Sequence, residues 1–409
     1  MSLLSVAEAL GRTVASAVAQ GPTPVEEVPL AEAAGRTLAA DLAALRTQPP
    51  FAASAMDGYA VRSSDLASVP TKLRVVGESA AGRGFAGFVE PGEAVRIFTG
   101  APVPAGADAI AIQEDTDEGA PHVIVRERPA AGRFVRPAGL DFQEGEALLR
   151  AGRRLDAGSL ALAAAMGHPR LPVRRPPRVA ILATGDELVR PGEPAGPDQI
   201  VASNPYAIAA IVAKAGGEAL DLGIAQDTLA DLRRAVAAAR EGDADLLVTL
   251  GGASVGDHDL VGQALGEDGM ELGFWRVALR PGKPLLHGRL GRTLILGLPG
   301  NPVSSVVCAI LFLAPAIRAL LGAPDAGSDP AEAAVLGGDL PPNDGRQDYL
   351  RATLARRADG APEATAHARQ DSSMLSVLAR SDGLIVRAPH APAARAGEPC
   401  SVIRLDRFC

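Results

Sequence analysis

Three segments of this chain each join an apolar run to a glycine turn and then to polar or charged residues. They span residues 179–187, 246–256 and 294–304. In open parallel sheets, ligands bind outside the carboxyl ends of the strands, where glycines let an anion reach backbone N–H groups. The helix N-terminus that follows adds about half a positive charge. Three such turns at one end of one sheet predict a pocket for an anionic, phosphate-bearing ligand.

The middle turn is the richest of the three in glycine. It contains Gly251, Gly252 and Gly256, with Ser254 between them. One glycine turn after a strand is common and indicates little. Three turns in one stretch of chain form a more specific pattern.

Carboxylates accompany these turns. Asp186, Glu187, Asp227, Asp257 and Asp259 fall at expected strand ends or helix starts. Helix capping is an alternative explanation, and it accounts well for Asp227 and Asp257. Carboxylates repel a phosphate unless a cation intervenes, and Mg²⁺ typically uses one or two carboxylates together with substrate phosphates. A phosphate ester in this pocket would therefore imply Mg²⁺, which would polarise a phosphoryl oxygen and stabilise the departing anion.

Two cations lie on a tight Pro-Gly turn, Arg280 and Lys283. Lysine is rare here, because Lys72 and Lys214 are the other two among 40 Lys and Arg residues. That bias is typical of a GC-rich genome, and a solvated hairpin tip is the alternative explanation of the turn. His258 has no second His or Cys nearby, which argues against a zinc site. A Walker A lysine motif is absent from the sequence.

Apolar strands alternate with helices after residue 177. Ser203 or Asn204 can cap the helix expected over 204–215. Asn301 can cap the last expected helix, with Pro302 at its first position. This alternation predicts a doubly wound parallel sheet. A further hairpin is expected from 275–279 and 284–287. The expected strands are 178–183, 219–224, 245–250 and 293–297, and the expected helices are 204–215, 228–240, 258–265 and 302–321.

The segments on either side of this α/β region differ from it in composition. Helices are expected over 4–19 and 156–166, on either side of a β-rich unit that we expect to be inserted into one domain. Residues 170–177 and 322–330 are rich in proline, glycine and polar residues, which predicts linkers. Short β-type runs after residue 330 predict a small barrel or sandwich.

Composition limits the function classes. The net charge of −8 argues against a nucleic-acid surface. The apolar run over 303–321 is interrupted by Ser, Pro and Arg, so we expect a buried helix and no membrane span. The first residues lack the basic region of a signal peptide. Cys308, Cys400 and Cys409 form neither a metal spacing nor a disulfide framework, which fits the cytoplasm.

A set of motifs spread along the chain resembles one family. They are residues 54–61 (SAMDGYAV), 97–104 (IFTGAPVP), 184–188 (TGDEL), 251–256 (GGASVG), 281–284 (PGKP) and 298–303 (LPGNPV). In this order they resemble the molybdopterin molybdenumtransferases, the family of MoeA and the gephyrin E domain. The resemblance extends over nearly the whole chain.

The resemblance implies a multidomain α/β plus β architecture and an elongated homodimer whose cleft draws on both subunits. The implied reaction inserts molybdate into adenylylated molybdopterin with Mg²⁺ and releases AMP. Proteins of the molybdenum-cofactor pathway are possible partners. The implied domains are a discontinuous N-terminal domain (1–45 and 140–172), an inserted β-rich domain (46–139), an α/β molybdopterin-binding domain (173–325) and a C-terminal β-barrel (326–409).

The resemblance also implies site residues. The catalytic set comprises Asp57, Glu187, Asp227 and Asp259. Asp57 would reach across from the partner subunit, and the other three residues would also hold the metal. The molybdate set comprises Arg280, Lys283, Pro284, Arg346 and Ser372. The substrate-binding set comprises Thr99, Asp141, Thr184, Gly185, Ser203, Asn204, Gly251, Gly252, Ser254, Gly256, Asp257, Arg276, Pro299, Gly300, Asn301 and Pro302.

The chain departs from the family pattern at two places. Arg276 and Arg280 stand where many relatives carry lysine, which keeps the charge but changes its reach and fork geometry. Residues 51–54 lack the Asp-Asn pair that is common before the first motif. These departures affect fine geometry rather than the expected charges.

Two other functions stay open from the sequence. One is adenylylation of molybdopterin, because a related pterin-binding domain does that chemistry in other proteins; the three additional domains argue against it. The other is a non-catalytic clustering scaffold, which the lack of an appended partner domain disfavours. The residues do not distinguish molybdate from tungstate, since the two oxyanions have nearly the same size and charge.

Overall fold

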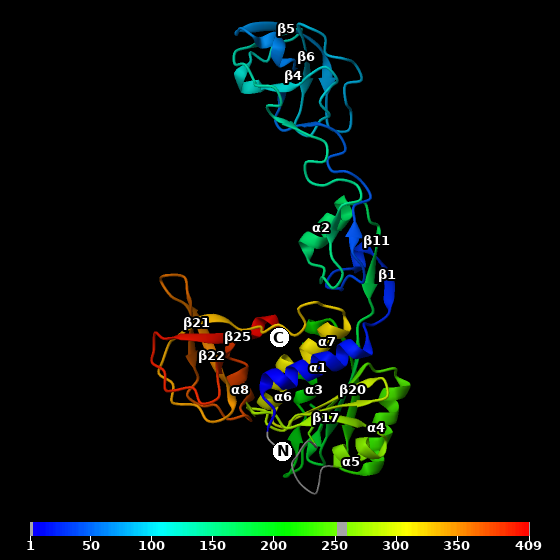
Figure 1. Cartoon of the computed structure of the whole chain (residues 1–409), viewed down its shortest axis with the longest axis vertical. Helices are drawn as coiled ribbons and strands as arrows, with labels where there is room; N and C mark the ends of the chain where they lie inside the picture. The colour runs from blue at the N-terminus through cyan, green and yellow to red at the C-terminus, as the bar shows by residue number, and fades with distance from the viewer. Residues whose placement is uncertain (1–2, 252–259, 409) are drawn as a thin grey trace.

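The computed structural model describes residues 3–251 and 260–408 of an elongated chain (Figure 1). A small β-rich unit lies at one end, and a larger body with the α/β sheet and the C-terminal strands lies at the other. The predicted fold class, a multidomain α/β plus β protein, is confirmed.

The α/β sheet has the strand order β15-β12-β16-β20-β19-β17. Neighbours among β15, β12, β16 and β20 are parallel, while β19 and β17 add antiparallel pairs. The four strands expected after residue 177 are therefore all present. Their bounds are β12 (Arg178–Thr184), β15 (Glu218–Ala225), β16 (Leu246–Leu250), β17 (Glu271–Trp275), β19 (Leu286–Leu290) and β20 (Thr293–Leu298).

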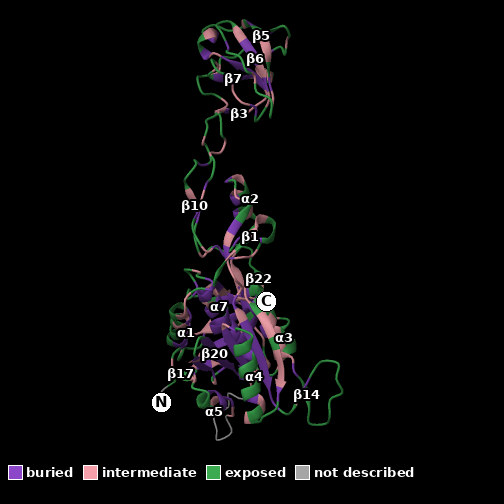
Figure 2. Cartoon of the chain, turned by 90° about the vertical axis from the view of Figure 1, so that its right-hand side faces the viewer, coloured by how far each residue is buried: buried purple, intermediate pink, exposed green. Residues whose placement is uncertain are grey.

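Helices cover both faces of this sheet. Successive residues of β12 alternate between two cores: Val179 and Ile181 join one, while Ala180 and Leu182 join the other. The pattern follows from the period of two in a strand and explains why the whole strand is apolar. Figure 2 shows the buried residues gathered in this body. The first face carries α3 (Asn204–Ala215), α6 (Pro302–Cys308) and α7 (Ala314–Leu320), and the second carries α4 (Leu229–Glu241) and α5 (Leu260–Glu267).

The helical run Pro302–Leu320 is long and apolar enough to cross a membrane by length and composition alone, but 89% of its apolar window is buried inside the protein. It is therefore a core helix, as the sequence predicts. A π turn at Ala309–Leu313 precedes Pro315, which lacks the N–H that a regular α-helix needs.

Helix α1 (Val6–Gln20) begins at a capping box in which Ser5 and Glu8 bond each other's backbone N–H groups. Its buried face includes Val6 and Ala17, which join the core formed by α3, α6 and α7. The helix thus packs with the α/β sheet, although the resemblance places it in the N-terminal domain.

The N-terminal domain forms from two segments of the chain. Leu38, Phe142 and Leu171 lie in one core although the β-rich unit separates them in sequence. The linker expected over 170–177 is wrong for its first five residues, because Leu171 and Val173 are fully buried in a paired strand. The elements are β1 (Val25–Pro29) paired with β11 (Arg170–Arg174), β2 (Leu42–Ala43) paired with β10 (Ala147–Leu149), and α2 (Ala157–Ala165), which Asp156 caps.

The β-rich unit between these segments contains a sheet of order β7-β4-β6-β5-β8, with β3 paired to β9. Two thin connections join it to the rest of the chain (Figure 1). The bounds are β3 (Ala53–Ser54), β4 (Gly58–Val61), β5 (Thr71–Ser79), β6 (Glu93–Ile97), β7 (Ala109–Ile112), β8 (His122–Val125) and β9 (Val135–Arg136).

The C-terminal strands form a closed barrel of order β22-β23-β21-β25-β24, because β24 also pairs with β22. The barrel accepts a strand from outside: β18 (Leu279–Arg280) pairs in parallel with β22. The remaining bounds are β21 (Glu332–Leu336), β22 (Gln347–Arg356), β23 (Pro362–Ala366), α8 (Leu375–Leu378), β24 (Gly383–Arg387) and β25 (Pro399–Arg404).

The hairpin expected from 275–279 and 284–287 forms only in part, because Arg276 and Val277 donate to the carbonyls of Leu285 and Lys283 but Leu279 and Arg280 pair with β22 instead. The antiparallel pair is β17 with β19, in which Trp275 faces Leu286. Arg276 then adopts a φ of 86°, which ends the strand and turns the chain toward the barrel. The Arg280 turn is therefore not a hairpin tip but part of a bridge between two domains.

Candidate active site

The glycine turns after β12, β16 and β20 converge. A Cβ atom on Gly251 would lie 2.8 Å from the carbonyl oxygen of Thr184, and one on Gly300 would lie 3.7 Å from the Cα of Gly251. Gly251 donates its N–H to Leu298, and Gly185 donates to Ala225. The three turns therefore meet at one edge of the sheet, as their sequence pattern predicts.

Replacing Gly251 by alanine should damage this edge. Its φ of 99° is rare for an L-residue, and the added Cβ would meet backbone. We expect a loss of about 1–3 kcal/mol in unfolding free energy. Urea unfolding followed by fluorescence of Trp275, the chain's single tryptophan, measures it. Gly266→Ala in α5, where no atom lies within 4 Å of the new Cβ, is the control and should not destabilise; equal stability of the two variants would contradict the prediction.

Polar side chains lie where the three glycine turns meet. Asn204, at the start of α3, donates to the carbonyl of Gly300 (2.7 Å), and Ser305 donates to that of Pro299. The hydroxyl of Thr184 is buried at this edge and has no hydrogen-bond partner within residues 3–251 and 260–408. Asn204 thus fixes the third turn, while Ser203 makes no side-chain capping bond at the helix start.

The carboxylates of the first turn lie beside Asp227. Asp186 accepts the N–H of Asp227 at 3.1 Å. Burial, together with the negative charges of Asp186 and Glu187, raises the pKa of the Asp227 carboxyl. Capping does not explain Asp227, because Thr228 caps α4 by accepting the N–H of Asp231. Asp186 and Glu187 therefore place negative charge near Asp227 at this edge of the sheet.

Part of the predicted site lies outside the described residues: Gly252, Ser254, Gly256, Asp257 and Asp259. Within residues 3–251 and 260–408, no group of three or more His, Cys, Asp or Glu side chains is close enough to hold a metal ion. The described part of the expected metal set is therefore Glu187 and Asp227.

The C-terminal barrel brings Ser372 to the third turn. Asn301 donates to the hydroxyl of Ser372 (2.9 Å), and the N–H of Val303 donates to its carbonyl. Asn301 therefore begins α6 without the side-chain cap expected of it. Arg351, which is 1% exposed, donates to the carbonyl of Asp371 and holds the adjoining loop. Pro302 occupies the first position of α6, as predicted.

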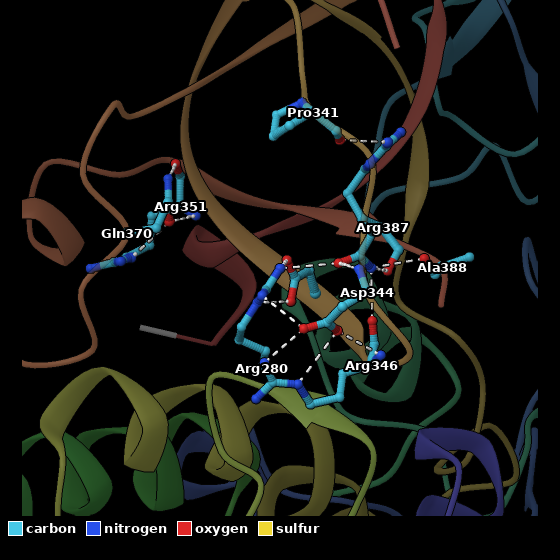
Figure 3. A network of polar contacts seen from close by, with 10 residues as sticks. Arg280, Pro341, Asp344, Arg346, Arg351, Gln370, Arg387 and Ala388 are labelled. Atoms are coloured by element: carbon cyan, nitrogen blue, oxygen red, sulfur yellow. Dashed lines mark hydrogen bonds and ion pairs between the residues drawn. The ribbon is translucent and has the colours of Figure 1, made fainter. Parts of the chain in front are cut away.

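Arg280 is held by the barrel (Figure 3). Its Nε and Nη2 atoms donate to the carboxylate of Asp348, Nη2 also donates to Asn343, and Nη1 donates to Asp344 at 3.1 Å. Asp344 also accepts from Arg346 at 2.8 Å. The two arginines expected to bind molybdate are thus already paired with carboxylates.

Lys283 lies on the same turn and is exposed. Its backbone carbonyl accepts the N–H of Val277, but its ammonium has no partner among the residues that the structure describes. Pro284 follows it. Arg276 packs its guanidinium over the ring of Trp275, 5.4 Å from the centroid. Among the described residues, the Lys283 ammonium is therefore left without an ion-pair partner on this turn.

The structure does not bring Asp57 and Thr99 to this edge within one chain. They belong to the β-rich unit at the opposite end of the molecule (Figure 1). There the carboxylate of Asp57 accepts from the N–H of Thr99 (2.7 Å) and from its hydroxyl (2.8 Å). These bonds, led by the backbone one, lower the pKa of Asp57. Asp141 is exposed and donates its N–H to the carbonyl of Gln48.

The sequence analysis missed Asn343, Asp344 and Asp348. Their partner Arg280 lies 63 to 68 residues earlier in the chain. The only local signal was the polar run Asn-Asp-Gly before Arg346, which is typical of a turn.

Comparison with known proteins identifies the family. Models of the MoeA N-terminal region (domain I and II), a probable molybdopterin binding domain and the MoeA C-terminal region (domain IV) match residues 4–167, 180–319 and 333–405.

Individual relatives agree with these matches. The molybdopterin molybdenumtransferase of Haemophilus influenzae is 36% identical over 384 residues, which is 93% of this chain and 94% of that protein. That of Nostoc is 40% identical over 74% of this chain and 70% of its own length. A crystal structure of the molybdopterin biosynthesis MoeA protein of Pyrococcus horikoshii OT3 superposes with a TM-score of 0.83 at 27% identity, covering 98% of this chain and 99% of the other. The chain belongs to the molybdopterin molybdenumtransferase (MoeA) family, the transferases of molybdenum cofactor biosynthesis.

Proposed function

We propose that this chain inserts molybdate into adenylylated molybdopterin in a Mg²⁺-dependent reaction that releases AMP. The observation that carries the proposal is the convergence of three glycine turns beside the carboxylates around Asp227, on a sheet whose helix α6 also contacts the Arg280–Lys283 turn through Cys308 and Gly282. The first two suit a phosphate with its metal ion, and the third suits an oxyanion.

The pterin phosphate and the AMP portion would lie against the turns at 251 and 298–303. The lack of a Cβ on Gly251 and Gly300 lets the three turns pack closely against one another there, which brings their backbone groups to one place. The start of α6 contributes its positive end to the same place.

Glu187 and Asp227 would hold Mg²⁺, together with Asp259 of the turn outside the described residues. Oxygen donors are the ligands that Mg²⁺ prefers, and a cation would offset the burial and the neighbouring negative charges that raise the pKa of Asp227. When bound, the ion supplies charge stabilisation at the phosphoryl oxygens of the leaving AMP.

The oxyanion would lie at Lys283, with Ser372 as a hydroxyl donor and with Arg280 and Arg346 as further cations. A tetrahedral dianion favours such a set because charge-assisted hydrogen bonds are about twice as strong as neutral ones. Holding molybdate beside the pterin converts a bimolecular encounter into a positioned reaction.

The proposed assembly is a homodimer in which Asp57 and Thr99 of one subunit complete the cleft of the other. The separation of these residues from the carboxylate cluster within one chain supports it (Figure 1). The cytoplasm is the proposed compartment, because Cys308 and Cys400 are unpaired thiols. Pathway proteins that deliver adenylylated molybdopterin are proposed partners.

The experiment that tests this function measures AMP release from adenylylated molybdopterin by the purified full chain. Release should require both molybdate and Mg²⁺, and it should stop when either is omitted. ATP-dependent adenylylation of metal-free molybdopterin, without molybdate-dependent AMP release, would instead identify an adenylyltransferase.

A further inference from the structure

Asp344 lies between the two arginines of the oxyanion set (Figure 3). Its Oδ2 atom accepts from Arg280 Nη1 at 3.1 Å and from Arg346 Nη2 at 2.8 Å, while Oδ1 accepts the Arg346 N–H at 2.8 Å. A carboxylate that bridges two guanidinium groups makes the contacts that a tetrahedral oxyanion would make there.

Asp348 contacts the same arginine in a different way. It is 3% exposed, begins β22 and takes the Nε and Nη2 edge of Arg280. That contact fixes the guanidinium and leaves Nη1 pointing at Asp344. Asp348 is therefore an anchor, and Nη1 is the donor that an arriving anion can use.

Asp344 occupies an exposed turn. Its side chain is 44% exposed, and Gly345 follows it. Asn343 holds the turn by donating to the carbonyls of Arg346, Arg387 and Ala388. The Arg346 side chain and backbone N–H, more than any other contact, lower the pKa of Asp344 to about 2, so the carboxylate stays charged at neutral pH. The Asp344 carboxylate can therefore leave the two arginines only when its side chain rotates away, and not by becoming protonated.

We propose that Asp344 is a built-in competitor for the oxyanion: its carboxylate occupies Arg280 and Arg346 until a dianion displaces it. The inference rests on the proposed function, because it assigns the incoming anion to the same two arginines. With Asp344 in place, the two cations and the two carboxylates, Asp344 and Asp348, balance. Displacement of Asp344 leaves one net positive charge beside Lys283.

The competition has a consequence for specificity. A monoanion offers Arg280 and Arg346 no more charge than the carboxylate already there, whereas molybdate offers twice as much. The resident carboxylate thus lowers the affinity of every anion that must displace it, and chloride, which gains less from the two arginines, is left the more weakly bound.

The test is calorimetric titration of the full-length protein with molybdate and with chloride. Asp344→Asn keeps the shape and the turn but removes the competing charge, so molybdate should bind about three- to tenfold more tightly and chloride should gain affinity by a similar factor. Asp359→Asn removes the same charge at the far end of β22, roughly 30 Å away along the strand. That control should change molybdate affinity by less than about twofold.

Two outcomes would overturn the inference. Unchanged affinity in Asp344→Asn would mean that the carboxylate does not compete, and weaker affinity would mean that Asp344 serves to orient Arg346 for binding. Molybdate-dependent AMP release, measured on the same preparations, separates this question from the proposed function. Turnover with unchanged affinity rejects the competitor alone, whereas tighter molybdate binding without turnover rejects the reaction alone.

Discussion

Mixing two inactive variants, Asp57→Ala and Asp227→Ala, should restore about a quarter of wild-type turnover. Random exchange of subunits makes half of the dimers mixed, and each mixed dimer then has one site with a complete set of side chains. Asp57 belongs to the β-rich unit and Asp227 to the α/β domain, and these two parts lie at opposite ends of the elongated molecule (Figure 1). Each variant alone should lose roughly a hundredfold or more in molybdate-dependent AMP release, the size expected for loss of a positioned charge.

The matched control mixes Glu187→Ala with Asp227→Ala. Both residues belong to the same edge of one sheet, so neither site of their mixed dimer is complete and turnover should stay absent. Subunit exchange is verified by mass spectrometry of differently tagged chains. If Asp57→Ala and Asp227→Ala fail to complement although mixed dimers are present, Asp57 does not act across the subunit boundary.

Arg280→Ala should loosen the attachment of the barrel to the α/β domain. Asp348, whose side chain is 5% exposed, would lose its bidentate partner. An unpaired and nearly buried carboxylate costs about 2–4 kcal/mol, a range that allows for the 43% exposure of the Arg280 side chain. Hydrogen exchange should therefore rise in peptides that contain β18 and the start of β22, where Gln347 donates its N–H to Ala278.

A double variant tests the cause of that loosening. Arg280→Met with Asp348→Leu removes both charges and leaves apolar side chains of similar size, so much of the lost protection should return. Peptides from the β-rich unit should exchange at the wild-type rate in all variants. Unchanged protection of β18 in Arg280→Ala would show that backbone pairing alone holds the barrel in place.

Local patterns predicted the elements that local interactions determine. The helix Asn204–Ala215 has the bounds expected from its caps, and Gly216 ends it in a left-handed conformation. The strands β12, β16 and β20 were evident because both of their faces are buried. The meeting of Gly251 with Gly300 followed from topology, because the two residues follow the neighbouring parallel strands β16 and β20.

Long-range pairing decided the features that the sequence analysis missed. The chain around Arg276 was read as a hairpin because its two halves are both apolar and close in sequence. In the structure, Leu279 and Arg280 pair with a strand that begins at Gln347, and no local pattern encodes that choice. Likewise, Thr228 caps α4 although residue type alone ranks Asp227 as the better cap.

The strand pairing of β18 with β22 also bears on how the protein is made. Synthesis runs from the N-terminus at about 5–20 residues per second, and domains fold as they emerge. The sheet from β12 to β20 is complete once residue 298 has emerged, but Arg280 lacks its carboxylate partners until Asp344 and Asp348 follow. A nascent or prematurely terminated chain therefore has its three glycine turns assembled and its Arg280 side chain unpaired, so that the proposed oxyanion site waits for the last domain to be translated.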